Sequence, residues 1–242
     1  MTPEEHEELY QNLLRAAREM AREMDYRCFE KAMITSLYLE SVKMKSNNEL
    51  CLEGWILTYT GKKFYPLKPK AEDIDIEDIA HALSNVCRFN GHSRAFYSVA
   101  QHSILVSALV RPELQLYALL HDAAEAYLGD IVRPIKSRLK AEVTVHQGQI
   151  ATLEMVSLST VETAIMNAIE MHFDLQKPDG DAWKELKYAD DMALGTEVND
   201  HICEGLAAEW GLPSLPDYKL TLLSPREAEE DFMMRFNELN KQ

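Results

Sequence analysis

Three ionisable residues, His121, Asp122 and Glu125, stand close together in the stretch 113–129, which is otherwise apolar beyond its first turn. On a helix, at about 100° per residue, His121 and Glu125 lie one turn apart with Asp122 beside them. A helix that is apolar nearly all round is buried, and buried charges are costly without compensation. The spacing therefore predicts a divalent cation or a hydrogen-bonded network here. An ordinary core His-Asp pair, with Glu125 reaching solvent, stays open as an alternative.

A further histidine, His102, precedes this group on a predicted helix over 98–110. Ser98 and Gln101 form a capping-box signature that begins this helix. Histidines on two consecutive antiparallel helices can meet, and they supply the nitrogen ligands that borderline divalent metals favour. A remote carboxylate would complete such a ligand set.

The order His102, His121-Asp122 and a distant Ala189-Asp190 resembles the H…HD…D pattern of the HD-domain phosphohydrolase superfamily. The resemblance implies that His102, His121, Asp122 and Asp190 ligate a divalent metal. Asp190 is preferred to Asp191 because its Ala-Asp dipeptide matches the family, and Asp191 stays open. Two His and two Asp suit Mn, Co, Fe, Ni or Zn, and Mg less well.

Longer segments carry the resemblance further. The stretch 121–136, HDAAEAYLGDIVRPIK, resembles the bacterial 5′-deoxynucleotidases of that superfamily and their phage-encoded deoxynucleotide triphosphohydrolase relatives. The pair Arg88-Phe89 ahead of Ala100-Gln101-His102-Ser103 does so too, although the family has Arg-Trp at this place. The resemblance covers roughly residues 55–202 and implies an all-α fold, an HD-domain helical bundle.

The same resemblance assigns catalytic roles to two carboxyl groups. Glu125 would orient or deprotonate the attacking water, and Asp130 would handle a proton at the leaving ester oxygen. Alternatives stay open: Glu125 as an orienter of a metal ligand, and Asp130 as a helix cap or a ribose partner.

Four further residues are predicted to bind the substrate. Arg88, Lys136 and Lys187 are the candidates for neutralising phosphate, although each can equally be a solvated surface charge. Phe89 would stack on a base or pack in the core.

The predicted function is metal-dependent hydrolysis of phosphate esters of (deoxy)nucleotides, with a 5′-deoxynucleotidase acting on deoxynucleoside monophosphates as the first expectation. A deoxynucleoside triphosphate triphosphohydrolase that releases tripolyphosphate is the nearest alternative. A dinuclear enzyme that also uses His146 and His172 is another alternative. A non-catalytic nucleotide-binding HD module is the alternative from a different class of protein.

The elements that must position these residues are mostly helical, around a short β-hairpin near 55–66 that is almost the only predicted β structure. We expect an N-terminal helical extension, 1–54, followed by an HD domain, 55–242. Asp181 is expected to cap one helix, and Ser224 with Glu227 another. The predicted helices cover 4–45, 76–86, 98–110, 113–129, 143–173 as one helix or two, a segment from about 183 onward, and a last one from 225.

The net charge of −15 over 242 residues argues against binding duplex nucleic acid, which requires a basic face. A small anionic nucleotide remains possible if a metal ion and a few cationic side chains offset the repulsion locally. No apolar run approaches the roughly 18 residues of a membrane span, and the first residues lack a signal-peptide pattern. We therefore expect a cytoplasmic protein without membrane contact, and the resemblance suggests a homo-oligomer.

Overall fold

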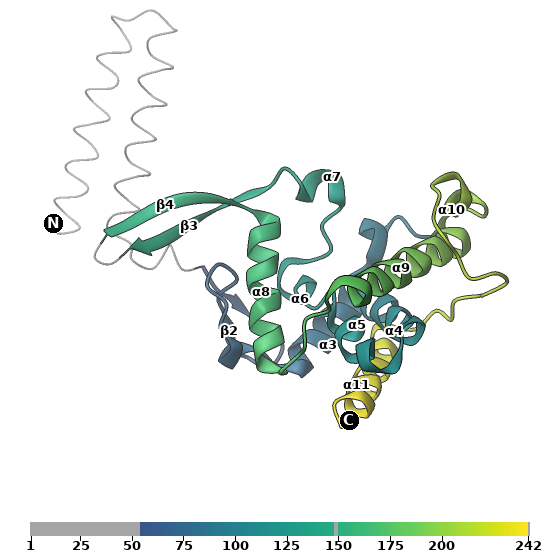
Figure 1. The fold of residues 1–242 in the computed structure, drawn as a ribbon, viewed down its shortest axis with the longest axis horizontal. Helices are drawn as coiled ribbons and strands as arrows, with labels where there is room; N and C mark the ends of the chain where they lie inside the picture. Colours follow the sequence, from purple (N-terminus) through teal and green to yellow (C-terminus); the bar gives the residue numbers. More distant parts are fainter. Residues whose placement is uncertain (1–53, 148–149, 242) are drawn as a thin grey trace, which may run out of the picture. The chain divides into compact units, whose positions relative to one another are not determined.

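The computed structural model describes residues 54–147 and 150–241, which belong to one compact unit, Glu53–Gln242. This unit is mainly helical and contains two small antiparallel hairpins (Figure 1). The predicted helix over 4–45 lies outside the described residues. The elements are β1 (Ile56–Leu57), β2 (Lys63–Phe64), η1 (Ala71–Asp73), α3 (Ile76–Asn85), η2 (Arg88–Gly91), α4 (Val99–Leu109), η3 (Pro112–Leu114), α5 (Gln115–Leu120), α6 (Glu125–Leu128), α7 (Arg133–Lys136), β3 (Lys140–Gln147), β4 (Ile150–Ser157), α8 (Leu158–His172), α9 (Gly180–Glu197), η4 (Val198–Ile202), α10 (Leu206–Glu209) and α11 (Pro225–Leu239).

The first hairpin confirms the prediction for residues 55–66. Ile56 pairs with Phe64 and Leu57 with Lys63. Gly61 adopts φ 83° in the turn, a conformation that glycine reaches without steric cost. Phe64 then points into the core, where it is fully buried.

The second hairpin corrects the sequence analysis. Lys140 pairs with Ser157 at the start of β3, so the predicted helix from about 143 is wrong up to residue 157. The prediction that β1 and β2 would be almost the only β structure is wrong as well. The stretch 142–145, Glu-Val-Thr-Val, is rich in β-branched residues, whose stiff side chains favour strands over helices. The helix of this region, α8, begins only at Leu158.

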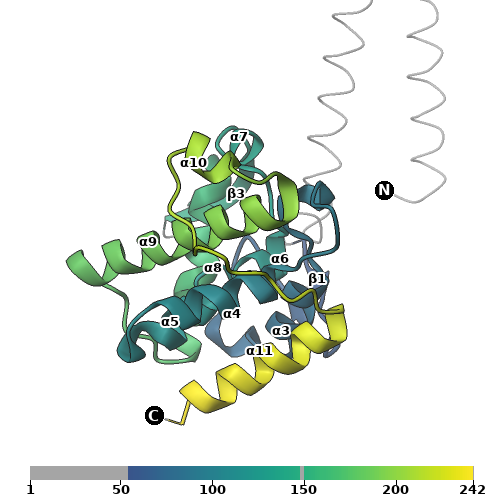
Figure 2. The same cartoon turned by 90° about the vertical axis from the view of Figure 1, so that its right-hand side faces the viewer.

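Helix α4 occupies the centre of the unit, between α9 on one side and α11 on the other (Figure 2), and it also contacts α3 and α5. Its first residues, Val99 and Ala100, belong to a core cluster shared with α3, α5, α8 and α11. Leu105 and Val106 belong to a second cluster with residues of α5 and α9. His102 stands between these two groups and has no exposed surface.

The stretch 113–129 is not one continuous helix. Between α5 and α6, residues 121–124 form tight turns, and several hydrogen bonds here connect an N–H to the carbonyl three residues earlier, such as Glu125 N to Asp122 O at 2.9 Å. Turns of this type contain about three residues rather than 3.6. His121 and Asp122 therefore project from a break in the helix. As predicted, α6 ends at Gly129, which adopts φ 77°.

Helix ends agree with the sequence at two places and differ at one. The capping boxes of Ser98 with Gln101 and of Ser224 with Glu227 are both present. The prediction that Asp181 caps a helix is wrong, because α9 begins one residue earlier with Asp179 at the N-cap position. Asp181 lies in the first turn instead, where its negative charge suits the positive end of the helix dipole.

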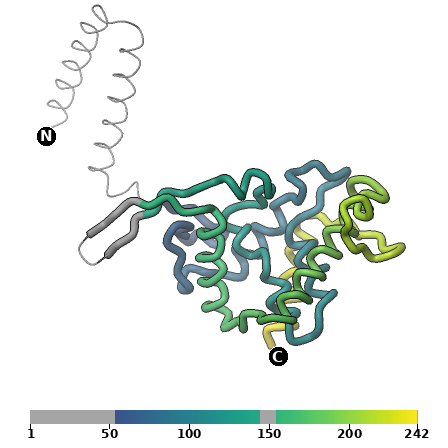
Figure 3. Tube along the Cα trace, turned by 45° about the horizontal axis from the view of Figure 1, so that its top comes forward, coloured from purple at the N-terminus to yellow at the C-terminus, as the bar shows by residue number. Residues whose placement is uncertain are grey.

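Helix α9 crosses the others and continues into the π-helical turn η4. Helix α10 lies at the end of the unit opposite to β3 and β4, as the trace in Figure 3 and the ribbon in Figure 1 both show. Gly195 allows residues 212–213 to pack directly on α9, since a Cβ there would lie 2.1 Å from Pro213 O. Within residues 54–147 and 150–241, no helix combines the length and apolar character needed to span a bilayer.

Candidate metal centre and its surroundings

The structure brings the four predicted metal ligands together from three places in the fold. His102 comes from the middle of α4, His121 and Asp122 from the break between α5 and α6, and Asp190 from α9. His102 Nε2 lies 3.2 Å from Asp190 Oδ1 and 3.7 Å from Asp122 Oδ2. His121 Nε2 lies 3.2 Å from the same Asp122 oxygen. One potential ligand atom from each of His102, His121 and Asp122 lies within 4.8 Å of the others, so this group could bind a metal ion.

The hydrogen bonds of the two imidazoles decide which nitrogens face this group. His121 Nδ1 lies 2.7 Å from Ala118 O, and because a carbonyl only accepts, Nδ1 carries the proton. His102 Nδ1 lies 2.7 Å from a carboxylate oxygen of Glu197 and donates in the same way. Both Nε2 atoms are buried and have no hydrogen-bond partner within the described part of the chain. Two unpartnered buried nitrogens beside carboxylates are what a cation site requires.

The charges around His102 also require a positive charge at this point. Burial and the nearby Arg88 lower the pKa of His102, but Glu197 and Asp190 outweigh them and raise it to about 9. Either a proton or a metal ion at Nε2 satisfies this demand. A divalent cation would satisfy both histidines and both aspartates at once.

The two aspartates are ionised and can act as oxygen ligands. Burial raises the pKa of Asp122, but the nearby imidazole of His121 holds it well below the usual range. Burial likewise opposes ionisation of Asp190, and His102 and Lys187 hold its pKa below the usual range. Two imidazole nitrogens and two carboxylates form a donor set suited to a borderline divalent metal.

Glu125, the first residue of α6, is buried beside the metal group, and its Oε2 has no partner within the described part of the chain. Burial, Asp122 and Asp130 raise the pKa of Glu125 to about 9, against the opposing charge of Lys136. Lys136 Nζ lies 4.0 Å from Glu125 Oε1. A carboxyl group with a raised pKa is typical of acid–base catalysts, because it can exchange a proton near neutral pH.

Asp130 follows Gly129, whose left-handed conformation turns the chain out of α6. Burial raises the pKa of Asp130, and so does the negative charge of Asp122, while Arg88 opposes them. The side chain therefore belongs to the electrostatic surroundings of the metal group.

Arg88, predicted to bind phosphate, lies in η2 and is almost entirely buried. Its Nε and Nη2 atoms lie 3.0 Å and 2.9 Å from Glu197 Oε2. Glu197 has no exposed surface and also binds His102, and it is a site residue that was not predicted from the sequence. A signal was available: Glu197 follows Asp190 by seven residues, which is two turns along one face of a helix.

The other predicted substrate contacts have protein partners. Phe89 adopts φ 56° and lies with its ring 5.5 Å from the Arg88 guanidinium, at the edge of the same region. Lys136 forms an ion pair with Glu162 on α8. Lys187 forms ion pairs with both Asp190 and Asp191, so its charge already serves a predicted metal ligand.

The dinuclear alternative needs His146 and His172, and the structure places His172 away from the metal group. His172, at the end of α8, bonds through Nδ1 to Ala71 O at 2.7 Å and packs edge-on against Phe173. It does not join the group around His102. His146 lies on β3, and its side chain is outside the described part of the structure.

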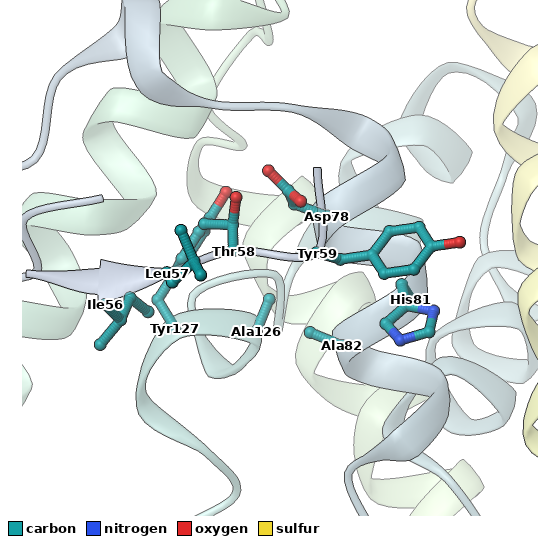
Figure 4. A pocket seen from close by; sticks show the side chains of 9 residues that line it. All are labelled: Ile56, Leu57, Thr58, Tyr59, Asp78, His81, Ala82, Ala126 and Tyr127. Atoms are coloured by element: carbon teal, nitrogen blue, oxygen red, sulfur yellow. The ribbon is translucent and has the colours of Figure 1, made fainter. Parts of the chain in front are cut away.

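A separate hollow of about 250 Å³ lies between the first hairpin, α3 and α6 (Figure 4). Tyr59 stacks on His81 at one side of it, with ring centroids 3.7 Å apart. None of the predicted metal, catalytic or substrate-binding residues lines it. The lining residues are Ile56, Leu57, Thr58, Tyr59, Asp78, His81, Ala82, Ala126 and Tyr127.

The fold and site thus define a mainly helical protein with a buried group that could bind a metal ion. No protein-family model matches the sequence. The chain is 36% identical over 192 residues to the uncharacterized protein YfdR of Escherichia coli (strain K12), an alignment that covers 78% of this chain and 97% of YfdR. It is 42% identical over 95 residues to an uncharacterized protein of Rhodobacter capsulatus, covering 36% of this chain and 48% of that protein. The chain belongs to the family of YfdR.

Proposed function

We propose that this protein is a metal-dependent phosphohydrolase of the HD-domain type that hydrolyses phosphate esters of (deoxy)nucleotides. Its first substrate class is the deoxynucleoside monophosphates, which makes it a 5′-deoxynucleotidase. One observation carries the proposal: the buried Nε2 atoms of His102 and His121 have no hydrogen-bond partner within the described residues and face two ionised aspartates.

The residues present fit a divalent metal. His102, His121, Asp122 and Asp190 would hold it through two nitrogens and two carboxylates. When bound, such a cation supplies Lewis acidity toward a phosphate oxygen and lowers the pKa of a nearby water. It also offsets the repulsion that a chain with net charge −15 exerts on an anionic substrate.

Glu125 is suited to orient the attacking water and take its proton. Its Oε2 is free of protein partners among the described residues, and it lies beside the metal group. With a cation held by the neighbouring ligands, the repulsion from Asp122 would be offset, the pKa of Glu125 would fall from its raised value, and Glu125 would be an ionised base.

Asp130 and Arg88 complete the reaction. The water oxygen forms a bond to phosphorus, the bond from phosphorus to the ester oxygen breaks, and Asp130 donates a proton to that oxygen. Arg88, whose Nε and Nη2 are engaged by Glu197, stabilises negative charge on the phosphate from its fixed position.

A product assay tests the proposal. The full chain, loaded with Mn or Co, is incubated with a panel of nucleoside and deoxynucleoside mono- and triphosphates, and chromatography separates phosphate from tripolyphosphate. We expect phosphate to be released from deoxynucleoside monophosphates by the wild type and by His81→Ala, but not by His121→Ala. His81 is the matched control because it lies at the separate hollow.

Each other outcome contradicts part of the proposal. Tripolyphosphate from a deoxynucleoside triphosphate would replace the substrate class while keeping the reaction type. No product across the panel, with the metal retained, would favour a non-catalytic nucleotide-binding protein. Equal activity of wild type and His121→Ala would overturn the site itself.

A further inference from the structure

Glu197 connects two parts of the candidate site that the sequence treats separately. One of its oxygens, Oε1, accepts from His102 Nδ1 at 2.7 Å. The other, Oε2, accepts from Arg88 Nε at 3.0 Å and from Nη2 at 2.9 Å. Both Glu197 and His102 lack any exposed surface, so water does not compete for these bonds.

Helix α9 therefore places a carboxylate beside each nitrogen of the His102 imidazole. Asp190 lies 3.2 Å from Nε2, and Glu197, two turns further along the same helix, binds Nδ1. Because both carboxylates belong to one helix, the ring cannot rotate without losing one of these contacts. The helix fixes the direction in which the Nε2 lone pair points.

We propose that Glu197 is the positioning residue of this site: it holds His102 in the tautomer and orientation that bind a divalent metal, and it fixes Arg88 beside that metal. A carboxylate that accepts from the distal N–H of a ligating histidine also makes that histidine a more basic ligand. The part that concerns Arg88 rests on the proposed function, whereas the part that concerns the metal does not.

Electrostatic balance explains why Glu197 can be charged in this place. An isolated buried carboxylate is costly, but a buried pair with good geometry and satisfied hydrogen bonds is tolerated. Arg88 supplies the opposite charge through two N–H groups, and His102 supplies the third hydrogen bond. Among the described residues, Glu197 is the carboxylate paired with His102 Nδ1, whereas Asp122 and Asp190 lie near Nε2.

The variant Glu197→Gln tests this role at constant side-chain volume. A glutamine has one acceptor oxygen and one donor amide, so it can serve either His102 or Arg88 but must turn its N–H₂ toward the other donor. Loss of such an orienting partner weakens metal binding by roughly 10–100-fold. We therefore expect the Kd of the full chain for Mn, measured by electron paramagnetic resonance without nucleotide, to rise by about this factor.

Glu185→Gln is the matched control. Glu185 lies on the same helix, but its partner is Arg111, which is away from the metal group. This variant should leave the Kd for Mn within about twofold of wild type. A Kd of Glu197→Gln within the same twofold range would overturn the proposal.

A measurement on the wild type covers the case in which Glu197→Gln does not fold. In the full chain with ¹⁵N-labelled histidine and Zn, nuclear magnetic resonance should show the Nδ1 proton of His102 shifted downfield by its hydrogen bond to the Glu197 carboxylate. A Glu197 that does not bind the Zn-bound ring would leave this proton at the position of an imidazole N–H without a carboxylate partner. That result overturns the proposal without any variant.

These readouts separate this inference from the proposed function. If Glu197→Gln loses Mn affinity but no nucleotide is hydrolysed by the wild type, the positioning role stands and the function is wrong. If nucleotides are hydrolysed and the Mn affinity of Glu197→Gln is unchanged, the function stands and the positioning role is wrong. Where both hold, the KM of Glu197→Gln should also rise, because Arg88 loses its fixed partner.

Discussion

The metal group and the hollow beside the first hairpin both contain histidines with acidic neighbours, yet their histidines differ in one respect. At the hollow, His81 is partly exposed, stacks on Tyr59 and bonds through Nδ1 to Glu229 at 2.9 Å. At the metal group, His102 and His121 each have a buried Nε2 without a partner among the described residues. The polar atoms of His81 therefore have solvent or protein partners. The Nε2 atoms of His102 and His121 still need a cation or a proton.

The hollow in the surface and the group of potential metal ligands lie at different places in the protein. The hollow has a volume of about 250 Å³ but contains no convergent ligand atoms from the predicted site. The metal group has the orphaned nitrogens, the ionised aspartates and the carboxyl groups of raised pKa. Unpaired buried polar atoms are therefore a stronger indication of a ligand site in this protein than open space is.

The largest difference is expected between the variants His121→Ala and His81→Ala. His121→Ala deletes a ligand, so we expect bound metal to be lost and nucleotide turnover to fall by about 1,000-fold or more, the rate equivalent of several kcal/mol of Lewis-acid stabilisation. His81→Ala should retain both. Elemental analysis after dialysis measures the bound metal, and the product assay measures turnover. Equal metal content in the two variants would contradict the prediction that His121, and not His81, is a metal ligand.

Within the metal group, Glu125→Gln should separate binding from catalysis. Its carboxyl group is not one of the predicted ligands, so we expect the metal to be retained while turnover falls by roughly 100- to 10,000-fold, as for the loss of a general base. Metal content and kcat are measured on the same preparation. Loss of the metal together with activity would show instead that Glu125 orients a ligand.

Two arginine variants test whether the ion pair beside the metal group contributes more to stability than a partly exposed ion pair does. Arg88→Ala leaves Glu197 buried without its counter-charge, which should cost about 3–5 kcal/mol of the free energy of unfolding. Arg111→Ala breaks a partly exposed pair with Glu185 and should cost at most about 1 kcal/mol. Urea unfolding of both variants measures the difference, and similar losses would contradict the assignment of a buried pair.

The smallest effect is expected at the hollow. Tyr59→Ala removes the ring that stacks on His81, and such aromatic contacts contribute about 0.5–1.5 kcal/mol. Because Tyr59 is largely exposed, we expect a loss of stability at the lower end of this range and no change in Mn affinity. A measurable fall in Mn affinity would contradict the conclusion that the hollow and the metal group are separate sites.

The sequence determined the features whose causes are local. The two capping boxes join residues three positions apart, and the first hairpin depends on a glycine turn, so each is encoded within a few residues. The same local reasoning was wrong at 140–157, where strands form, and at Asp181, which lies two residues after the N-cap residue Asp179. The expected continuous helix over 113–129 is broken at the very residues that carry the ligands.

Tertiary structure alone decided how the site is held. The type and order of His102, His121, Asp122 and Asp190 predicted a metal group, and the structure places them together. Glu197 is 95 residues from His102 and 109 from Arg88, so no local pattern could connect them. Side-chain type fixes which atoms can bind a metal, but only the packing of α9 against α4 determines which nitrogen is protonated and where its lone pair points.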